Sequence, residues 1–254
     1  MEKHNNNLIR KENGGIICSH GDFSIDPVRP VKRALITHAH FDHISFGCEE
    51  YICSPETSVL LKERIGKKIK VKSHGYNESF KINGIKISFY PSGHILGSSQ
   101  IKLEGGNEKW LITGDFKRQR DDTCLNYQEV KTDFLICEST FALPIFNWDS
   151  TNKIVNQIVE WVNKSPNVTS ILFCYSLGKA QRLLNELKNK NIKNIYVHSN
   201  IKKINDIYID QGINLKDVAT INAGIKLKDY QGSLLLMPPS QNKFKFLKKY
   251  GDYQ

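Results

Sequence analysis

Three histidines and one aspartate lie within six residues near the start of the chain, and their side chains are ligands that metal ions use. The run His-Ala-His-Phe-Asp-His occupies residues 38–43 and follows the apolar residues 34–36. Neutral imidazoles and carboxylates are the usual ligands of a catalytic zinc ion, which keeps one coordination position open for water. We expect His38 and His40 to bind one metal ion, and Asp42 and His43 to reach a second ion nearby.

Two further candidate ligands follow later strand-like segments. His94 comes after residues 85–89, whose alternation of apolar and polar side chains is typical of a strand, and Asp115 comes after the apolar run 110–112. A glycine beside each of them lets the backbone turn tightly. We expect His94 to complete the ligand set of the first ion. Asp115 has two carboxylate oxygens and is expected to bridge both ions. The alternative, for His94 or Asp115 taken alone, is an ordinary loop residue without a metal.

The elements that must position these ligands alternate along the chain. Apolar periodicity predicts strands at residues 34–37, 85–90, 110–113, 133–137, 171–175, 195–197 and 233–236. It predicts helices at 55–65, 151–163, 178–190 and 201–211, with Ser150 as the N-cap of the second. The alternating run 67–72 reads as a protected edge strand. An aromatic stretch at 146–148 marks a junction, so we expect two portions, residues 1–145 and 146–254.

Composition is ordinary for a globular domain, with 39% hydrophobic and 24% charged residues in 254. We find no apolar run near the roughly 18 residues of a membrane span. The N-terminal residues lack the apolar core of a signal peptide, and we expect a cytoplasmic protein. The six cysteines are irregularly spaced. We expect thiols rather than a disulfide framework, with Cys137 and Cys174 packed as small hydrophobes.

Positive charge is concentrated in the second half of the chain. Residues 1–145 carry 20 basic and 18 acidic side chains, whereas residues 146–254 carry 16 and 8. A basic surface beside a metal site suits a polyanion whose phosphate must reach the metal ions. The alternative is that the lysines reflect compositional bias and form an ordinary solvated surface.

At the candidate ligands the chain resembles the metallo-β-lactamase superfamily. The segment 38–43, His94 and Asp115 match its metal motifs in order and spacing. The resemblance implies that Asp26 is the acidic residue that steadies the metal loop without binding metal, with Asp22 as a nearby competitor for that role. It also implies an α/β fold, an αββα sandwich.

A second set of residues resembles the β-CASP branch, whose members process nucleic acids. Glu138, within residues 135–141, resembles the first acidic motif of that branch, and residues 175–184 resemble the strand-to-helix turn of its inserted domain. The segments 21–27 and 93–98 resemble a subgroup of DNA-ligase-associated exonucleases, which are also similar to messenger-RNA 3′-end processing factors. The resemblance runs from about Gly15 to near Tyr250. It implies a metallo-β-lactamase-like domain at 1–145 and a smaller, inserted β-CASP-like α/β domain at 146–254.

The chain also departs from this pattern. Relatives continue with two further motifs that supply a proposed histidine acid and another metal-binding histidine, whereas residues 251–254 close this sequence without either. The chain therefore resembles a truncated or split member that lacks the return to the first domain. In relatives Glu138 orients that histidine acid, so here it has no such partner. His198 follows a strand of the second portion, and we interpret it as structural.

The resemblance implies a nuclease that uses two divalent ions, zinc by default and manganese as the alternative. Its acidic catalytic residues would be Asp26, Asp42, Asp115 and Glu138. We expect a DNA exonuclease linked to DNA repair, with nucleic acid and possible repair proteins such as a ligase as partners. The alternatives are a ribonuclease or messenger-RNA 3′-end processing factor, a small-molecule hydrolase, and a silent nucleic-acid-binding remnant.

Two basic residues are candidates for contact with nucleic acid. Lys179 lies at a predicted helix N-terminus, where backbone N–H groups can meet a phosphate, and Arg182 lies one turn further along. A plain connection between a strand and a helix is the alternative interpretation of this segment.

Overall fold

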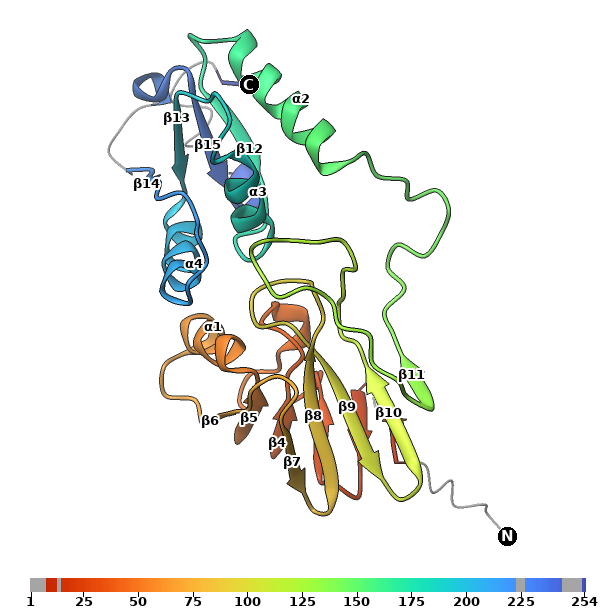
Figure 1. Ribbon diagram of the computed structural model, residues 1–254. Coiled ribbons are helices and arrows are strands. Elements are labelled where there is room, and N and C mark those ends of the chain that lie inside the picture. The colour runs from red at the N-terminus through yellow and green to blue at the C-terminus, as the bar shows by residue number, and fades with distance from the viewer. Residues whose placement is uncertain (1–7, 13–14, 223–226, 244–252) are drawn as a thin grey trace. The chain divides into compact units, whose positions relative to one another are not determined.

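The structure of the protein is a computed structural model that describes residues 8–12, 15–222, 227–243 and 253–254. The chain divides into two compact units, residues 1–140 and 141–254. This division falls slightly before the predicted junction after residue 145. Each unit has its own sheets and its own apolar core, and we describe each by itself (Figure 1).

The first unit is built on two sheets. One sheet has six strands in sequence order: β1 (Arg10–Glu12), β2 (Gly15–Cys18), β3 (Phe23–Ile25), β4 (Arg33–Leu35), β5 (Glu50–Cys53) and β6 (Val71–Ser73). The strands β3 to β6 are parallel. The carboxyl ends of β4 and β5 therefore lie at the same edge of the sheet, where the chain can present a group of side chains together.

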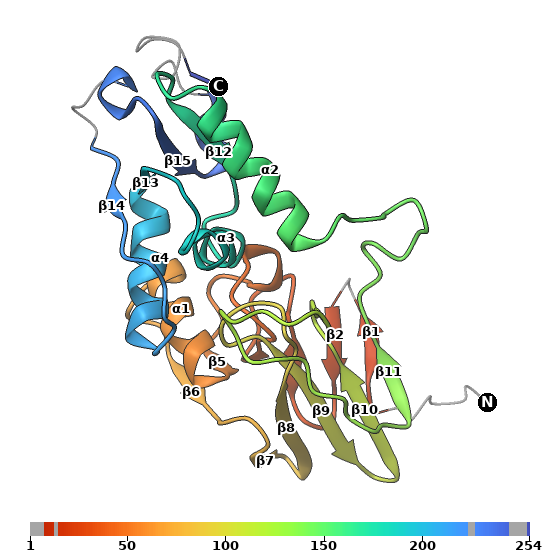
Figure 2. The ribbon, with the colours of Figure 1, turned by 45° about the horizontal axis from the view of Figure 1, so that its top comes forward.

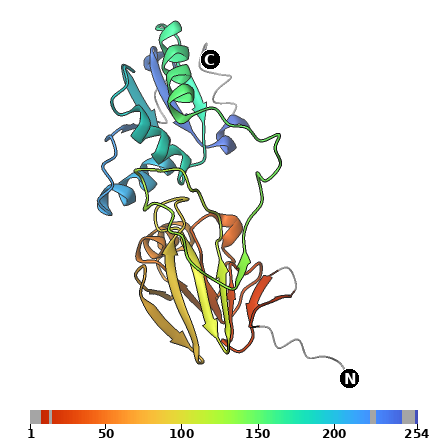
Figure 3. The same cartoon turned by 45° about the vertical axis from the view of Figure 1, so that its right-hand side comes forward.

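The second sheet has five strands in the order β11-β10-β9-β8-β7. They are β7 (Ser79–Ile82), β8 (Ile85–Pro91), β9 (Ser99–Gly105), β10 (Glu108–Ile112) and β11 (Phe134–Ile136). One apolar cluster joins the two sheets, with Ile25, Leu35 and Ile52 from the first and Ile87, Phe89 and Ile101 from the second among its members. The unit is thus a β-sandwich, and Figure 3 shows its two layers of strands.

A single α-helix, α1 (Pro55–Ile65), occurs among the described residues of the first unit. It begins where the Ser54 hydroxyl accepts a hydrogen bond from the Thr57 N–H at 3.2 Å, with proline in the first turn. Leu60 and Leu61 of this helix are fully buried. The helix packs against β5 and β6. A 3-10 turn, η1 (Phe41–His43), lies within the motif that follows β4.

The second unit is a parallel four-stranded sheet with helices (Figure 2). The strand order is β12-β15-β13-β14, formed by Ser170–Phe173, Ser233–Met237, Asn194–Val197 and Ala219–Thr220. Its helices are α2 (Thr151–Lys164), α3 (Lys179–Leu187) and α4 (Ser199–Asp210), and two 3-10 turns cover Leu227–Tyr230 and Pro239–Lys243. Apolar side chains of all three helices join the sheet residues in one core cluster, including Val155, Leu184 and Ile201.

The predicted strands and helices are confirmed within a few residues at their ends, and so is the α/β class. The predicted edge strand in the run 67–72 occurs slightly later, as β6 at the edge of its sheet. The predicted helix 178–190 ends early, at Leu187. No helix among the described residues is long and apolar enough to cross a membrane.

One sequence interpretation was wrong, that of the apolar run at β11. Cys137 is exposed, although it was expected to pack as a small hydrophobe, and Leu135 in β11 is 57% exposed. The reason is that β11 lies at the edge of its sheet, where it pairs with β10 alone among the described strands. Cys174 is buried as expected, and none of the six cysteines forms a disulfide.

Candidate metal centre

Four of the predicted ligands converge in the first unit. One ligand atom from each of His38, His40, His94 and Asp115 lies within 4.8 Å of the others. His38 and His40 follow β4, His94 follows β8 and Asp115 follows β10. The structure therefore brings together, from both sheets, residues that the sequence separates by more than seventy positions.

The ring nitrogens of this group face one another. His40 Nδ1 lies 3.0 Å from His38 Nε2 and 3.3 Å from His94 Nε2. Asp115 Oδ2 lies 3.8 Å from His38 Nε2 and 3.5 Å from His94 Nε2. Three imidazole nitrogens and one carboxylate oxygen are the donor set of a zinc site. These four atoms face one another with more lone pairs than N–H donors, and a cation at their centre would bind the remaining lone pairs. These residues fit a divalent metal ion.

A second group of ligands lies on the other side of Asp115. Its Oδ1 atom is 3.4 Å from His43 Nε2, and Asp42 Oδ2 is 3.8 Å from the same nitrogen. Asp42 is the most open member, because its side chain is 79% exposed. The two oxygens of Asp115 thus face the two predicted ligand sets, His38 and His94 on one side and His43 on the other.

Asp26 holds the loop that carries the motif. Its Oδ1 accepts a hydrogen bond from the Thr37 N–H at 2.8 Å, and its Oδ2 accepts one from the Thr37 hydroxyl at 2.5 Å. Asp26 Oδ2 also lies 2.8 Å from His43 Nδ1. Asp22, the competitor, instead pairs with Lys32 and Arg33 at 3.1 and 2.9 Å. The geometry therefore favours Asp26 for the steadying role, and that role stays a prediction.

The loops of His94 and Asp115 depend on close backbone packing. Gly114 has a φ of +54°, and a Cβ atom there would lie 2.6 Å from Thr37. At Gly93, with a φ of +75°, it would lie 2.2 Å from the Lys117 carbonyl oxygen. The Ser98 hydroxyl accepts hydrogen bonds from the N–H groups of His94 and Ile95, each at 3.1 Å. Only glycine allows the chain to approach this closely beside each ligand.

Burial and charge set the protonation of the histidines. Burial, together with His43 and the other imidazoles, holds the pKa of His38 well below its usual value. Burial and the nearby His40 lower the pKa of His94 to about 4. Burial also acts to lower the pKa of His43, but hydrogen bonds to Asp115 and Asp26 outweigh it and raise that pKa to about 10. His38 and His94 are therefore neutral and ready to bind a cation at pH 7, whereas His43 must first lose a proton.

Thr37 is a site residue to which the sequence analysis gave no role. Besides its two bonds to Asp26, its hydroxyl lies 3.1 Å from His38 Nδ1. This contact leaves Nε2 of His38 to face His40 and Asp115. The signal was present in the sequence, because Thr37 directly precedes the motif at the end of a predicted strand, where a hydroxyl can orient a metal-binding histidine.

The remaining predicted site residues lie outside the cluster. Glu138 accepts a hydrogen bond from the Thr140 N–H at 3.1 Å and forms no hydrogen bond or ion pair with the candidate ligands among the described residues. In the second unit, Lys179 is exposed at the start of α3, and Arg182 donates to the Thr151 hydroxyl at 2.8 Å. His198 caps α4, because its Nδ1 accepts from the Asn200 N–H at 3.1 Å, and this is a structural contact.

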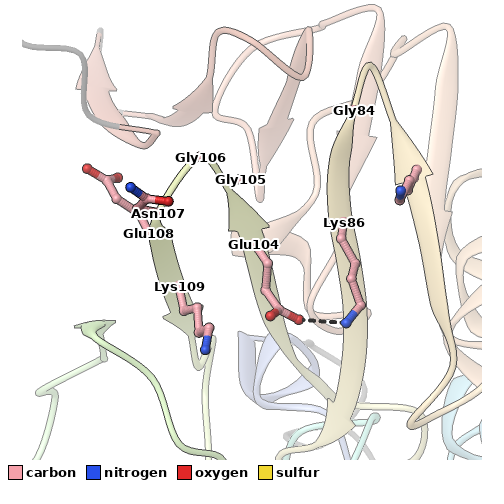
Figure 4. Close-up of a pocket in the computed structure, with 9 residues that line it drawn as sticks. Gly84, Lys86, Glu104, Gly105, Gly106, Asn107, Glu108 and Lys109 are labelled. Atoms are coloured by element: carbon pink, nitrogen blue, oxygen red, sulfur yellow. Dashed lines mark ion pairs between the residues drawn. The ribbon is translucent and has the colours of Figure 1, made fainter.

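A surface hollow of about 550 Å³ lies elsewhere on the first unit (Figure 4). Lys86 and Glu104, an ion pair at 3.0 Å, and the hairpin residues Gly84 and Gly106 line it. β8 starts beside this hollow and ends before His94, so the hollow and the metal ligands lie at opposite ends of the same strand. We assign no chemistry to it.

No family model matches the chain. Among curated proteins, it is 32% identical over 173 residues to a protein of Opitutus terrae named "Probable DNA ligase", covering 66% of this chain and 17% of that protein. It is 34% identical over 122 residues to "Endoribonuclease YSH1" of Yarrowia lipolytica, covering 45% and 14%. It is 26% identical over 202 residues to "RNase J-like protein" of Methanocaldococcus jannaschii, covering 67% and 48%. The chain spans less than half of the length of these relatives.

One solved structure is similar to most of the chain. It is a protein of unknown function from Enterococcus faecalis V583, with a TM-score of 0.53 and 15% identity, covering 87% of this chain and 57% of that one. At this level of identity the likeness concerns the fold alone. It agrees with the α/β architecture described above.

Proposed function

Because this chain is related to the β-CASP proteins of the metallo-β-lactamase superfamily, we propose that it is a metal-dependent nuclease that hydrolyses phosphodiester bonds. A single observation carries the proposal: the two carboxylate oxygens of Asp115 face two separate sets of ligands, His38 with His94 and His43. A shared carboxylate between two ligand sets is the arrangement of a two-metal phosphodiesterase. The names of the relatives, which include an endoribonuclease and an RNase J-like protein, support the same reaction class.

The residues of this chain would each have a defined task. His38, His40 and His94 would hold the first ion, and Asp42 and His43 the second, with Asp115 between them. Two divalent ions, zinc by preference or manganese, would supply activation of a water molecule and neutralisation of phosphate charge. Asp26 would keep the His43 ring in place through Nδ1. Glu138 would act away from the ligands, since it forms no hydrogen bond or ion pair with them among the described residues.

We propose DNA as the substrate, with hydrolysis from an end and a role in DNA repair. The relative named "Probable DNA ligase" aligns with two thirds of the chain and supports this choice, and it is also the basis for a ligase as a partner. The basic second half, with Lys179 and Arg182, would bind the phosphate backbone. The cytoplasm would be the location.

A ribonuclease is the second candidate. The relatives named "Endoribonuclease YSH1" and "Cleavage and polyadenylation specificity factor subunit 3" favour it, each aligned over about half of this chain. The candidate ligands alone do not separate the two substrates, because they meet the phosphate and not the 2′-hydroxyl.

A nuclease assay tests the proposal. End-labelled single-stranded DNA, duplex DNA and RNA would be incubated with the full chain and zinc or manganese. Loss of cleavage in His40→Ala, with cleavage kept in His20→Ala, is the expected result, since His20 is an exposed histidine outside the cluster. Absence of cleavage on every substrate with both metals would contradict the proposal and favour a silent nucleic-acid-binding protein.

A further inference from the structure

We propose that Phe41 and Phe46, together with Arg64, bind an unpaired nucleobase of the substrate beside the candidate metal centre. This inference rests on the proposed nuclease function and adds how the substrate strand is held. These three residues, named the stacking platform below, all belong to the first unit. None of them is a predicted metal ligand.

The two phenylalanine rings are exposed next to the ligands. Phe41 lies in the turn η1 between His40 and Asp42, and it is 52% exposed. Phe46 is 57% exposed, and its ring is stacked on that of Phe41 with centroids 6.1 Å apart and planes inclined by 21°. A single exposed apolar side chain is ordinary on a protein surface, whereas here two exposed rings lie side by side next to the candidate ligands.

Arg64, from the last turn of α1, completes the platform. The central carbon of its guanidinium lies 3.8 Å from the centroid of the Phe41 ring, which is a cation–π contact. The Nε atom is buried and has no hydrogen-bond partner among the described residues. Within the described part of the chain, Arg64 forms no ion pair within 4.0 Å. Its guanidinium is therefore held on the ring, where the Asp42 carboxylate also acts on it, and a phosphate group of the substrate would share this charge with Asp42.

This combination of groups has a specific chemistry. Exposed aromatic rings with a stacked guanidinium bind single-stranded nucleic acid, because every base has a face that can stack. A metal centre that cuts a phosphodiester bond needs the adjacent nucleotide fixed within reach. Since Phe41 is the immediate neighbour of His40 and Asp42, a base on the platform would place its own phosphate next to the ligands. The platform would accept any base and would favour an unpaired strand end over a duplex.

Binding measurements on the full zinc-loaded chain test the inference. The first probe is a fluorescent, single-stranded phosphorothioate DNA of ten thymidines, which resists cleavage. The other probes are the same strand with a single abasic site, placed at a different position in each. Phe41→Leu and Phe46→Leu remove a ring and keep apolar volume. Phe134→Leu is the matched control, because Phe134 is also 44% exposed in the first unit but stacks on Trp110 at 4.6 Å on the edge strand.

We expect the unaltered chain to lose about 5- to 150-fold in affinity when the stacked base is removed, as base–aromatic stacking requires. Phe46→Leu should weaken binding of the complete strand by a similar factor and should lose the sensitivity to the abasic position. Phe134→Leu should behave as the unaltered chain. Phe41→Leu is the second test variant and should behave as Phe46→Leu does. The zinc content and thermal unfolding of each variant show whether the metal centre and the fold are intact.

Two results would overturn the inference. One is that no abasic position changes the affinity of the unaltered chain. The other is that Phe46→Leu and Phe41→Leu lower the affinity for the complete strand and for every abasic strand by the same factor. The outcome is separable from that of the proposed function. Cleavage by the unaltered chain without any abasic sensitivity would leave a nuclease and remove the platform. Abasic-sensitive, Phe46-dependent binding without cleavage would keep the platform and remove the nuclease.

Discussion

Asp26 Oδ2 lies 2.8 Å from His43 Nδ1, and the other nitrogen of the same ring faces Asp115. Asp26 thus contacts the last histidine of the motif directly. Because Asp26 also accepts two hydrogen bonds from Thr37, one carboxylate contacts both ends of the candidate metal-binding segment. This relationship gives the first prediction.

Asp26→Asn should weaken metal binding at the second ligand set without abolishing the first. Loss of a partner that orients a metal-binding histidine typically lowers metal affinity by about 10- to 100-fold. Competition with a chromophoric chelator would measure the two affinities. Asp22→Asn is the matched control, since Asp22 is exposed and pairs with Lys32 and Arg33. Equal metal affinities in both variants would remove the role assigned to Asp26.

The pKa of His43 predicts how the stability of the metal-free chain depends on pH. Its folded pKa of about 10 lies above the ordinary value of 6.5, so the protonated ring stabilises the fold. This contribution is complete below about pH 6.5 and is lost as the pH rises toward about 10. In the presence of a chelator, the urea midpoint should fall across that range in the unaltered chain and fall less in His43→Gln. The same pH slope in both proteins would contradict the assignment.

Gly114→Ala should destabilise the first unit by about 1–3 kcal/mol and reduce metal uptake, because a side chain there combines an unfavourable φ with a clash. The added Cβ would lie 2.6 Å from Thr37, whose hydroxyl contacts Asp26 and His38. Gly106→Ala isolates the backbone effect, since Gly106 has a φ of +59° and open space around it. Chemical denaturation of both variants is the measurement, and an equal loss of stability would refute the packing argument.

The sequence was sufficient for much of this account, for physical reasons. Ligand chemistry and strand ends are local properties, so the six metal-ligand candidates and the helices could be predicted from short segments. The Arg64–Phe41 contact could not, because it depends on how α1 packs against the loop after β4. The exposure of Cys137 was missed because periodicity cannot tell an edge strand from a central one.

Lys179 and Arg182 should contribute to salt-dependent binding of nucleic acid. Each phosphate contact by a lysine or arginine adds about 0.7–0.9 to the salt slope of the logarithm of the binding constant. Lys179→Gln and Arg182→Gln should each lower that slope in the full chain, measured by fluorescence anisotropy between about 50 and 200 mM salt. Over this range one phosphate contact changes the affinity by about threefold. Lys203→Gln is the control variant, because Lys203 lies on another helix of the same unit, α4, and its loss should leave the slope unchanged. An unchanged slope in both test variants would exclude these residues as phosphate contacts.

The central claim is that Asp115 joins two metal sites, and metal stoichiometry tests it most directly. The purified chain would be saturated with zinc, dialysed and analysed for zinc per chain by mass spectrometry, with Asp115→Ala treated in parallel. We predict about two zinc ions per unaltered chain and a loss of at least one in the variant, as expected for a shared carboxylate. An unaltered chain that retains no zinc, or an Asp115→Ala variant that retains both ions, would contradict the account.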